Sequence, residues 1–406
     1  MPGDAPAEAP TDPAGAMMSF PDIVVTPTAG ILGTPEPFEF KGGPRWPDFS
    51  SQVDARHLRD ATPRPFDSPP DPPAEVPDTL PEAIWCGPVC GHFGHAIADF
   101  GMRIAASAAL PGGLPLLFSR PAVGGAHPIA EPPAFFAEML QQLGADPGRA
   151  VLLRQPVRVG RLHVLPQAER LRGPRPSEAH LDLMDRVTAR GRDPDLAGRT
   201  VFVSRSKIRA DSLRGRIAAE AYLDDVLARA GVVVVHPEAL PLAEQMRLYR
   251  SAGTLVFSEG SALHGLQLLG RVSGRIGVLL RRTRGRMAEG AVSGRFARVH
   301  WLNVLDGMAH GLRRDGKGAE VGGGVTVLDP QALLAALGDR FGLHLGPHWD
   351  HAAYREACLA DVSTWLHYRN RLRHRTPHPE GDVATAQETA RSVRLFADVL
   401  DRLPPV

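Results

Sequence analysis

Two histidines and an aspartate stand at helical spacing in the first half of the chain. His92, His95 and Asp99 occupy positions i, i+3 and i+7, so on a helix they would share one face. A histidine or aspartate whose pKa lies near the working pH can serve as a general base. The same side chains could form a facial set of metal ligands, or they could be ordinary residues of a helix face. The neighbouring Cys86 and Cys90 complete no known zinc spacing with them, so the sequence does not favour a metal site.

A second group of residues suits the binding of phosphate. Arg205 and Lys207 stand close together after an apolar run. Arginine can hold phosphate through two parallel hydrogen bonds, and lysine adds a compact charge. Farther along, Gly260 precedes Ser261 and Ala262 at the predicted start of a helix, where exposed N–H groups and the helix dipole favour a phosphate. The alternative is that these residues form only a solvated turn and a helix cap.

Short apolar runs alternate with amphipathic segments from residue 201 onward, and this alternation positions both phosphate-binding groups. The runs predict strands at 201–204, 232–235 and 254–257, with helices that begin at Asp211 or Ser212 and at 242. Continuous apolar runs are typical of parallel strands that are buried on both faces. The pattern predicts a right-handed, doubly wound βαβαβα unit, whose ligand crevice lies at the carboxyl ends of its strands. Arg205 and Gly260 both follow strand ends, which places them at that crevice.

The remaining chain divides into an N-terminal segment, a second α/β unit and a helical tail. Residues 43–82 are crowded with prolines and predict an extended wrap or linker with little regular structure. A helix is predicted from residue 92 to residue 110. We expect four parts: a Pro-rich, partly disordered segment at 1–82, an N-terminal α/β unit at 83–192, a C-terminal Rossmann-like unit at 193–330 and a helical extension at 331–406.

Composition and charge exclude several classes of protein. The chain has 406 residues, of which 43% are hydrophobic and 22% charged, as in soluble globular proteins. A net charge of +1 argues against a nucleic-acid-binding protein, which would depend on many phosphate contacts. Three cysteines do not make a disulfide framework, and neither a signal peptide nor an apolar run of transmembrane length stands out. We expect a cytoplasmic protein that could work peripherally at the inner surface of the membrane.

Several of these residues recur in an order and spacing that resembles glycosyltransferase family 61, formerly a domain-of-unknown-function family associated with capsular polysaccharide biosynthesis. The resemblance rests on Ser204-Arg205-Ser206, Glu220, Pro237-Glu238, Glu244-Gln245 and Ser258-Glu259-Gly260-Ser261-Ala262-Leu263-His264. In the first half, residues 91–95, Asp99 and Arg103 match the family segment G-H-F-G-H-F-L-x-[ED]-x-L-x-R. The chain departs from the family pattern at Ala219, where an asparagine is frequent, and at Pro241, where a serine is frequent.

The resemblance implies a GT-B-like architecture, in which two Rossmann-like α/β units face a crevice and helices follow at the C-terminus. It implies an enzyme that moves a sugar from a nucleotide-sugar donor, with uridine diphosphate as the favoured carrier, to a glycan or lipid-linked acceptor in polysaccharide biosynthesis. The reaction would be inverting and would need no metal or other cofactor. His95 is the favoured base, with His92 and Asp99 as alternatives.

On the donor side, the residue chemistry and the resemblance together point to residues of the C-terminal unit, namely Arg205, Lys207, Glu220, Glu259, Gly260, Ser261, Ala262 and His264. Positive charge and backbone dipoles there would stabilise the departing diphosphate in place of a metal ion, and His264 could donate a hydrogen bond to it. Two other functions stay open. One is a metal-dependent hydrolase that uses His92, His95 and Asp99, and the other is a glycan-binding assembly subunit without activity.

Overall fold

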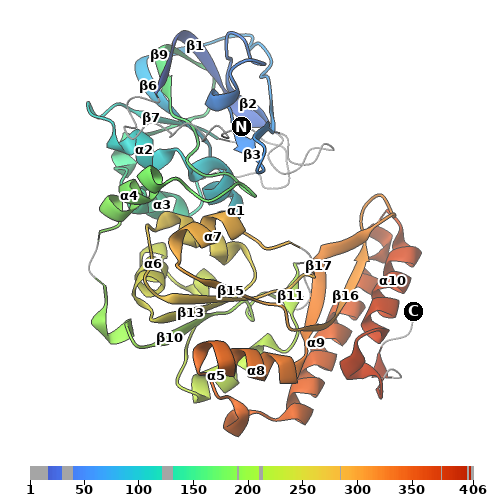
Figure 1. Ribbon diagram of the computed structural model, residues 1–406. Coiled ribbons are helices and arrows are strands. Elements are labelled where there is room, and N and C mark those ends of the chain that lie inside the picture. Colours follow the sequence, from blue (N-terminus) through green and yellow to red (C-terminus); the bar gives the residue numbers. More distant parts are fainter. Residues whose placement is uncertain are drawn as a thin grey trace, which may run out of the picture.

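The computed structural model describes residues 17–29, 40–120, 131–189, 192–209, 214–283, 285–375, 377–399 and 402–403. It is an α/β protein, which confirms the predicted class, and it consists of two stacked units with an arm beside them (Figure 1). We call these parts the N-terminal unit (17–189), the central unit (192–304 and 330–345) and the C-terminal arm (305–328 and 349–403). The predicted helix caps at Asp211 and Ser212 lie outside the described residues.

The N-terminal unit is built on a mixed seven-stranded sheet of order β5-β2-β1-β9-β6-β7-β8. Its strands are β1 (Met18–Ala29), β2 (Phe40–Pro44), β5 (Asp67–Ser68), β6 (Asp78–Pro88), β7 (Leu116–Ser119), β8 (Ala150–Leu153) and β9 (Val157–Val164). The four strands from β9 to β8 run parallel, whereas β1 joins β9 in the antiparallel sense. The helices α3 (Phe135–Gln142) and α4 (Glu178–Val187) belong to the same unit.

The proline-crowded stretch 43–82 is more structured than the sequence indicates. It supplies the end of β2, the short strands β3 (Leu58–Arg59) and β4 (Arg64–Pro65), β5 and the start of β6. Strands of two residues are too short to produce an alternating pattern, and prolines at their ends mask them further. The division of the chain at residues 82, 192 and 330 stays a prediction, although this segment clearly contributes strands to the N-terminal sheet.

The central unit is an all-parallel sheet of order β12-β10-β13-β14-β15, as the alternating runs predict. The strands are β10 (Thr200–Val203), β12 (Val233–Val235), β13 (Thr254–Ser258), β14 (Arg275–Leu279) and β15 (Val299–Leu302), and the helices are α5 (Glu220–Arg229), α6 (Leu242–Ser251), α7 (Glu289–Arg295) and α8 (Pro330–Phe341). This is the 2-1-3-4-5 order of flavodoxin-like sheets, which bind ligands at the carboxyl ends of the first and third strands. Those strands are β10 and β13, which precede Arg205 and Gly260.

The C-terminal arm is a hairpin backed by two helices. The hairpin consists of β16 (Leu305–Leu312) and β17 (Ala319–Leu328), and β11 (Arg216–Ile217) of the central unit joins it in the order β11-β17-β16. The helices are α9 (His351–Arg371) and α10 (Pro379–Arg391). Both helices lie in the stretch 331–406 where a helical extension is expected, but the hairpin is not predicted because glycines interrupt its apolar pattern. One of them, Gly311, is required by packing, since a Cβ there would overlap the buried ion pair of Arg369 with Asp382.

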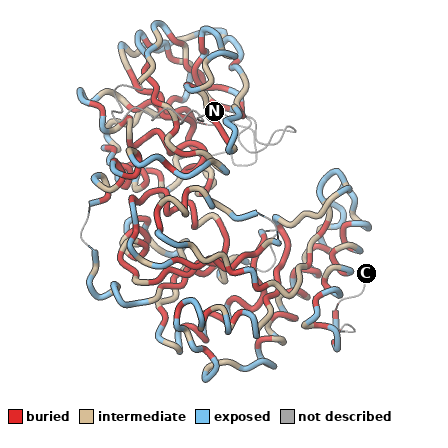
Figure 2. The backbone as a smooth tube through the Cα atoms, viewed as in Figure 1, coloured by how far each residue is buried: buried red, intermediate tan, exposed pale blue. Residues whose placement is uncertain are grey.

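A single hydrophobic cluster runs through the junction of the two units. It includes Ile84 and Phe118 from the N-terminal sheet together with Val203, Met246 and Phe257 from the central unit. Figure 2 shows buried backbone continuing from one unit into the other. The arm has a separate cluster around Trp365 and Phe396. None of the helices among the described residues has the length and apolar character needed to cross a lipid bilayer.

Candidate active site

A cleft of about 780 Å³ lies where the two units meet, and it collects residues from all three parts of the molecule. The N-terminal unit contributes residues 91–95, the central unit contributes the turns after β10, β13 and β14, and the arm contributes Gly322. Among the described residues, the lining contains no carboxylate but six arginines, namely Arg172, Arg205, Arg214, Arg281, Arg282 and Arg286. A cleft of this composition attracts an anionic ligand.

The histidine segment is not the continuous helix that its spacing predicts. It consists of a short turn α1 (Phe93–His95), a π-helix η3 (Ala96–Gly101) and α2 (Ile104–Ala109). His92 stands before the helix, where its Nδ1 accepts a hydrogen bond from the His95 backbone N–H at 3.4 Å. The wider π turn brings Asp99 directly against His95, and such turns are frequent at functional sites.

His95, Asp99 and Arg59 form a chain of charged hydrogen bonds that leads away from the cleft. His95 Nδ1 lies 2.6 Å from Asp99 Oδ2, and Arg59 donates to both carboxylate oxygens at 2.8 and 2.6 Å. Burial by itself would raise the pKa of Asp99, but the hydrogen bonds from His95 and Arg59 lower it below the usual range. An ionised carboxylate can only accept, so His95 carries a proton on Nδ1, and in the neutral ring Nε2 is the acceptor.

Solvent exposure separates the roles of these residues. The His95 side chain is 21% exposed and lines the cleft, whereas the Asp99 side chain is fully buried. Asp99 therefore acts on a substrate only through His95, as a positioning residue. His92 lines the cleft as well, and its ring centroid lies 4.7 Å from that of His95.

Arg59 is a residue that the sequence analysis missed. It comes from β3, inside the proline-crowded stretch, and its side chain is buried with its guanidinium 4.0 Å from the Phe66 ring centroid. Gln167 fixes the same region, because its Nε2 donates to the Asp99 carbonyl at 2.9 Å and its Oε1 accepts from the Leu58 N–H. No local pattern marks Arg59, since its partner lies forty positions away.

The arrangement weighs against a metal centre built on His92, His95 and Asp99. Both oxygens of Asp99 are already held by Arg59 and His95. Within the part of the chain that the structure describes, no three His, Cys, Asp or Glu side chains are grouped so that they could hold a metal ion.

Arg205 and Arg281 carry charge into the other wall of the cleft. Arg205 Nη2 donates to the Gly215 carbonyl at 2.9 Å, and Arg281 Nη1 donates to the Gly322 carbonyl at 3.2 Å. In both residues Nε is buried without a partner, and neither forms an ion pair with a described carboxylate. Burial lowers the pKa of both, that of Arg281 to about 10. An anionic ligand would supply the counter-charge that the partly buried Arg205 and the buried Arg281 lack among the described carboxylates.

Glu220 and Glu259 lie behind the cleft, where they support its turns. Glu220 Oε1 accepts from the Arg205 N–H at 2.8 Å and from the Ser258 hydroxyl, so it joins the turns after β10 and β13. Burial raises the pKa of Glu220 to about 7. Glu259 accepts from the Arg281 N–H at 2.9 Å and from Arg282 Nη2 at 2.8 Å. Direct donor contacts of either carboxylate stay predictions.

The helix that follows β13 differs in type from the one that the sequence predicts. Gly260 and Ser261 line the cleft, but the helix that follows is the 3-10 helix η7 (Ser261–Leu268). A Cβ on Gly260 would overlap Arg205 Nη1 and lie 2.6 Å from its Cζ, so the glycine makes room for the guanidinium. Ala262 is partly buried against the core, and Lys207 is exposed outside the cleft lining. Donor binding by these two residues stays a prediction.

The histidine segment and the glycine turn are in direct contact. A Cβ on Gly94 would lie 3.0 Å from His264 Cδ2 and 3.1 Å from Ser261 Cβ. The glycine at position 94 therefore lets the histidine side of the cleft approach the phosphate side closely. The two groups of residues, singled out separately in the sequence, meet in one site.

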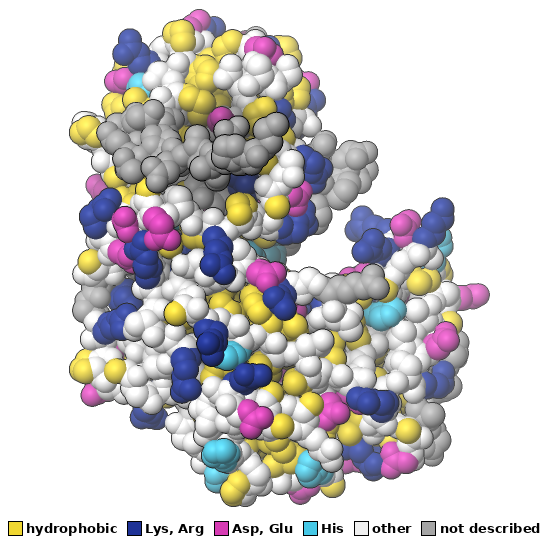
Figure 3. Space-filling view, in the orientation of Figure 1, with side chains coloured by type: hydrophobic (Ala, Val, Ile, Leu, Met, Phe, Trp, Pro, Cys, Tyr) yellow, Lys and Arg dark blue, Asp and Glu magenta, His cyan; other side chains and the backbone are white. Residues whose placement is uncertain are grey.

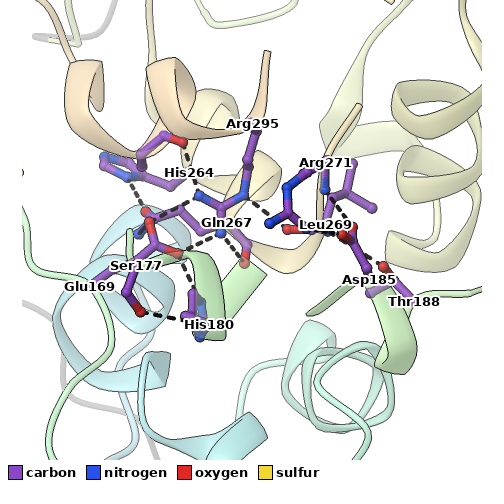
Figure 4. A network of polar contacts seen from close by, with 12 residues as sticks. Glu169, Ser177, His180, Asp185, Thr188, His264, Gln267, Leu269, Arg271 and Arg295 are labelled. Atoms are coloured by element: carbon purple, nitrogen blue, oxygen red, sulfur yellow. Dashed lines mark hydrogen bonds and ion pairs between the residues drawn. The ribbon is translucent and has the colours of Figure 1, made fainter. Parts of the chain in front are cut away.

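His264 belongs to a buried polar network that fixes its ring (Figure 4). Its Nδ1 lies 2.9 Å from Gln267 Oε1, and Gln267 Nε2 donates to Glu169 Oε2 at 3.3 Å. Arg295 donates to both Glu169 oxygens, at 3.0 and 2.5 Å, and His180 lies 3.2 Å away. Because the carboxylate only accepts, the Gln267 oxygen must face His264, which makes Nδ1 the donor and Nε2 the acceptor.

This assignment bears on the predicted role of His264. Burial lowers the pKa of His264, so the ring is neutral near pH 7. A neutral ring with the proton on Nδ1 offers the cleft an acceptor. The predicted donation to a departing phosphate would need the imidazolium form, which burial disfavours.

Comparison with known proteins agrees with the resemblance seen in the sequence. The family model described as Glycosyltransferase 61 matches residues 93–270. The matched region includes His95, Asp99, the turn at Arg205 and His264, and it ends before Arg281. No curated protein matches the chain.

Proposed function

We propose that this chain, whose residues 93–270 match the Glycosyltransferase 61 family, transfers a sugar from a nucleotide-sugar donor to a hydroxyl of a glycan or glycolipid-type acceptor. The observation that carries the proposal is the pairing of two facing groups in one cleft. A histidine oriented by a buried carboxylate stands on one wall, and the partly buried Arg205 and the buried Arg281, which form no ion pair with a described carboxylate, stand on the other. We also propose a GT-B-like arrangement, a role in polysaccharide biosynthesis and a cytoplasmic location.

His95 is the proposed general base. Its Nε2 takes the proton of the acceptor hydroxyl while the hydroxyl oxygen attacks the anomeric carbon of the donor sugar. The bond between that carbon and the phosphate oxygen breaks, and its electron pair leaves with the nucleoside diphosphate. A single displacement of this kind inverts the anomeric centre. Asp99 stabilises the imidazolium that forms, and Arg59 keeps Asp99 ionised.

Arg205 and Arg281 are the proposed partners of the diphosphate, together with the first N–H groups of η7. Positive charge that is already in place where negative charge develops lowers the barrier without reorganisation. We propose that these groups take the part that a divalent cation has in other transferases, so that the reaction proceeds without metal. His264 Nε2 would accept a hydrogen bond from a sugar hydroxyl.

Titration calorimetry with nucleoside diphosphates, beginning with uridine diphosphate, tests the donor site. We expect binding that Arg205→Ala weakens by roughly 1.5–3 kcal/mol, the worth of a hydrogen bond to a charged group. Lys207→Ala is the matched control, because it removes a positive charge from the same turn outside the cleft, and it should bind like the wild type. Binding and transfer should survive EDTA. The proposal fails if no nucleoside diphosphate binds, or if both variants lose affinity equally.

A further inference from the structure

The free end of the C-terminal arm concentrates positive charge. Two segments lie side by side there, the turn 313–318 between β16 and β17 and the residues 371–375 and 377–380 where α9 ends and α10 begins. A Cβ on Gly316 would lie 2.9 Å from the His378 ring, and both turns line one shallow pocket. We call this region the basic tip; its cationic residues are Arg313, Arg314, Lys317, Arg371, Arg373 and Arg375.

The charge of the basic tip is out of proportion to that of the whole chain. Its six arginines and lysines face only two carboxylates, those of Asp315 and Glu380, whereas the complete chain has a net charge of +1. All six cationic residues are exposed. Among the described residues, Arg313, Arg314, Lys317, Arg371 and Arg375 form no ion pair with a carboxylate. The rest of the molecule is therefore net negative, and the field of the protein is polarised toward the tip.

We propose that the basic tip docks on an anionic lipid surface. Its exposed cationic residues are spread over two neighbouring turns, which suits many weak contacts with lipid headgroups. The two turns contain no Phe, Trp or Tyr on which a nucleic-acid base could stack. Figure 3 shows Lys and Arg side chains gathered at the free end of the arm, across a hollow from the N-terminal unit.

The position of the tip relates this surface to the cleft. Gly322 of β17 lines the cleft, and the hairpin turn ends just before Ala319, the first residue of the same strand. At about 3.3 Å per residue, the tip starts about 10 Å from the cleft lining. A protein docked by the tip would hold its cleft near the membrane, where a lipid-linked acceptor is presented. That last consequence rests on the proposed function, whereas the docking itself does not.

Co-sedimentation with phosphatidylcholine vesicles, with and without phosphatidylglycerol, tests the proposal on the full chain. We expect binding to the anionic vesicles only, and its loss between about 0.1 M and about 1 M salt as the screening length shortens from about 10 to about 3 Å. Each basic residue near an anionic surface contributes roughly fivefold to partitioning. The triple variant Arg371→Gln, Arg373→Gln, Arg375→Gln should therefore bind roughly a hundredfold more weakly.

The matched control is the triple variant Arg154→Gln, Arg158→Gln, Arg161→Gln, which removes the same charge from exposed positions of the N-terminal unit. It should bind vesicles like the wild type. Equal losses in both triple variants, or no binding of the wild type, would overturn the proposal. So would tighter binding to soluble polygalacturonate than to vesicles of equal charge, which would make the partner an acidic glycan. The tip variant should bind nucleoside diphosphates with wild-type affinity. A loss of vesicle binding can then be told apart from a loss of the proposed donor site.

Discussion

Arg59 donates a hydrogen bond to each carboxylate oxygen of Asp99, and both side chains of this bidentate ion pair are almost completely buried. The pair lies immediately behind His95, whose Nδ1 shares Asp99 Oδ2 with the guanidinium. Removing such a charge partner from the interior is far more costly than losing an exposed ion pair. The proline-crowded segment that carries Arg59 is thus part of the site, and it sets the charge state of the residue that orients His95.

We expect Asp99→Asn to reduce turnover by roughly 10²–10⁴-fold, because an amide can donate to Nδ1 and so favour the wrong tautomer of His95. Nucleoside diphosphate affinity should stay unchanged, since the donor groups lie on the opposite wall. His95→Ala should cost a similar factor, and the double variant no more than either single one, because the pair acts as a unit. Transfer assays and calorimetry on all three proteins measure this. If the loss of turnover in the double variant were the product of the two single losses, Asp99 would act independently of His95.

Gly260→Ala should weaken nucleoside diphosphate binding about as much as Arg205→Ala, although it removes no charge. The new Cβ would displace the Arg205 guanidinium, while the extended backbone at Gly260, with φ of −179°, accepts any residue. The double variant should lose no more than either single one, because both changes remove the same contact. Gly198→Ala is the control, since a Cβ there meets nothing within 4 Å. Wild-type affinity in Gly260→Ala would refute the role given to Arg205.

The free energy of unfolding should decrease as pH rises through neutrality, owing to Glu220. Its folded pKa of about 7 lies above its ordinary value of 4.5, so the folded state holds the proton more tightly. This contribution is complete below pH 4.5 and disappears as pH passes the folded pKa, a change of roughly 3 kcal/mol at most. Denaturant titrations across this range should show a flatter profile for Glu220→Gln. The exposed Glu238→Gln serves as the control, and an unchanged slope in Glu220→Gln would contradict the assignment.

Histidine ¹⁵N spectra should show His264 as a neutral ring with its proton on Nδ1, assigned by the loss of its signals in His264→Asn. Gln267→Met removes the acceptor that fixes this tautomer and should shift the ring toward Nε2–H. The Gln155→Met variant, changed at an exposed position, should leave the signals in place. A wild-type ring protonated on Nε2 would reverse the orientation that we give to the Gln267 amide.

Local sequence patterns predict some of the strands and site residues, but they carry no information about others. The His95–Asp99 pair is visible in the spacing, and the central strands are visible as Val-rich runs, because each signal lies within a few positions. Arg281 could have been found, since it follows β14 at the same sheet edge as Arg205. Arg59 and Glu169 could not, because each acts across many positions on a partner that tertiary packing supplies.

Ala219 shows how a departure from a family pattern acquires a physical meaning. It precedes α5 with φ of 55°, in the left-handed region where asparagine is enriched and alanine is strained. The resemblance marks this position as one where asparagine is frequent. The structure therefore gives a backbone reason for asparagine at this position, and the alanine of this chain adopts the same conformation with strain.

The apolar cluster shared by the two sheets limits how substrates can come and go. If the two units moved apart, this apolar surface would be exposed to water. At about 25 cal/mol per Å², exposing roughly 400 Å² of apolar surface would cost roughly 10 kcal/mol. An opening of that kind would be too rare to serve each turnover. Substrates and products therefore enter and leave between two walls that stay packed on one core, past the arginines that line the cleft.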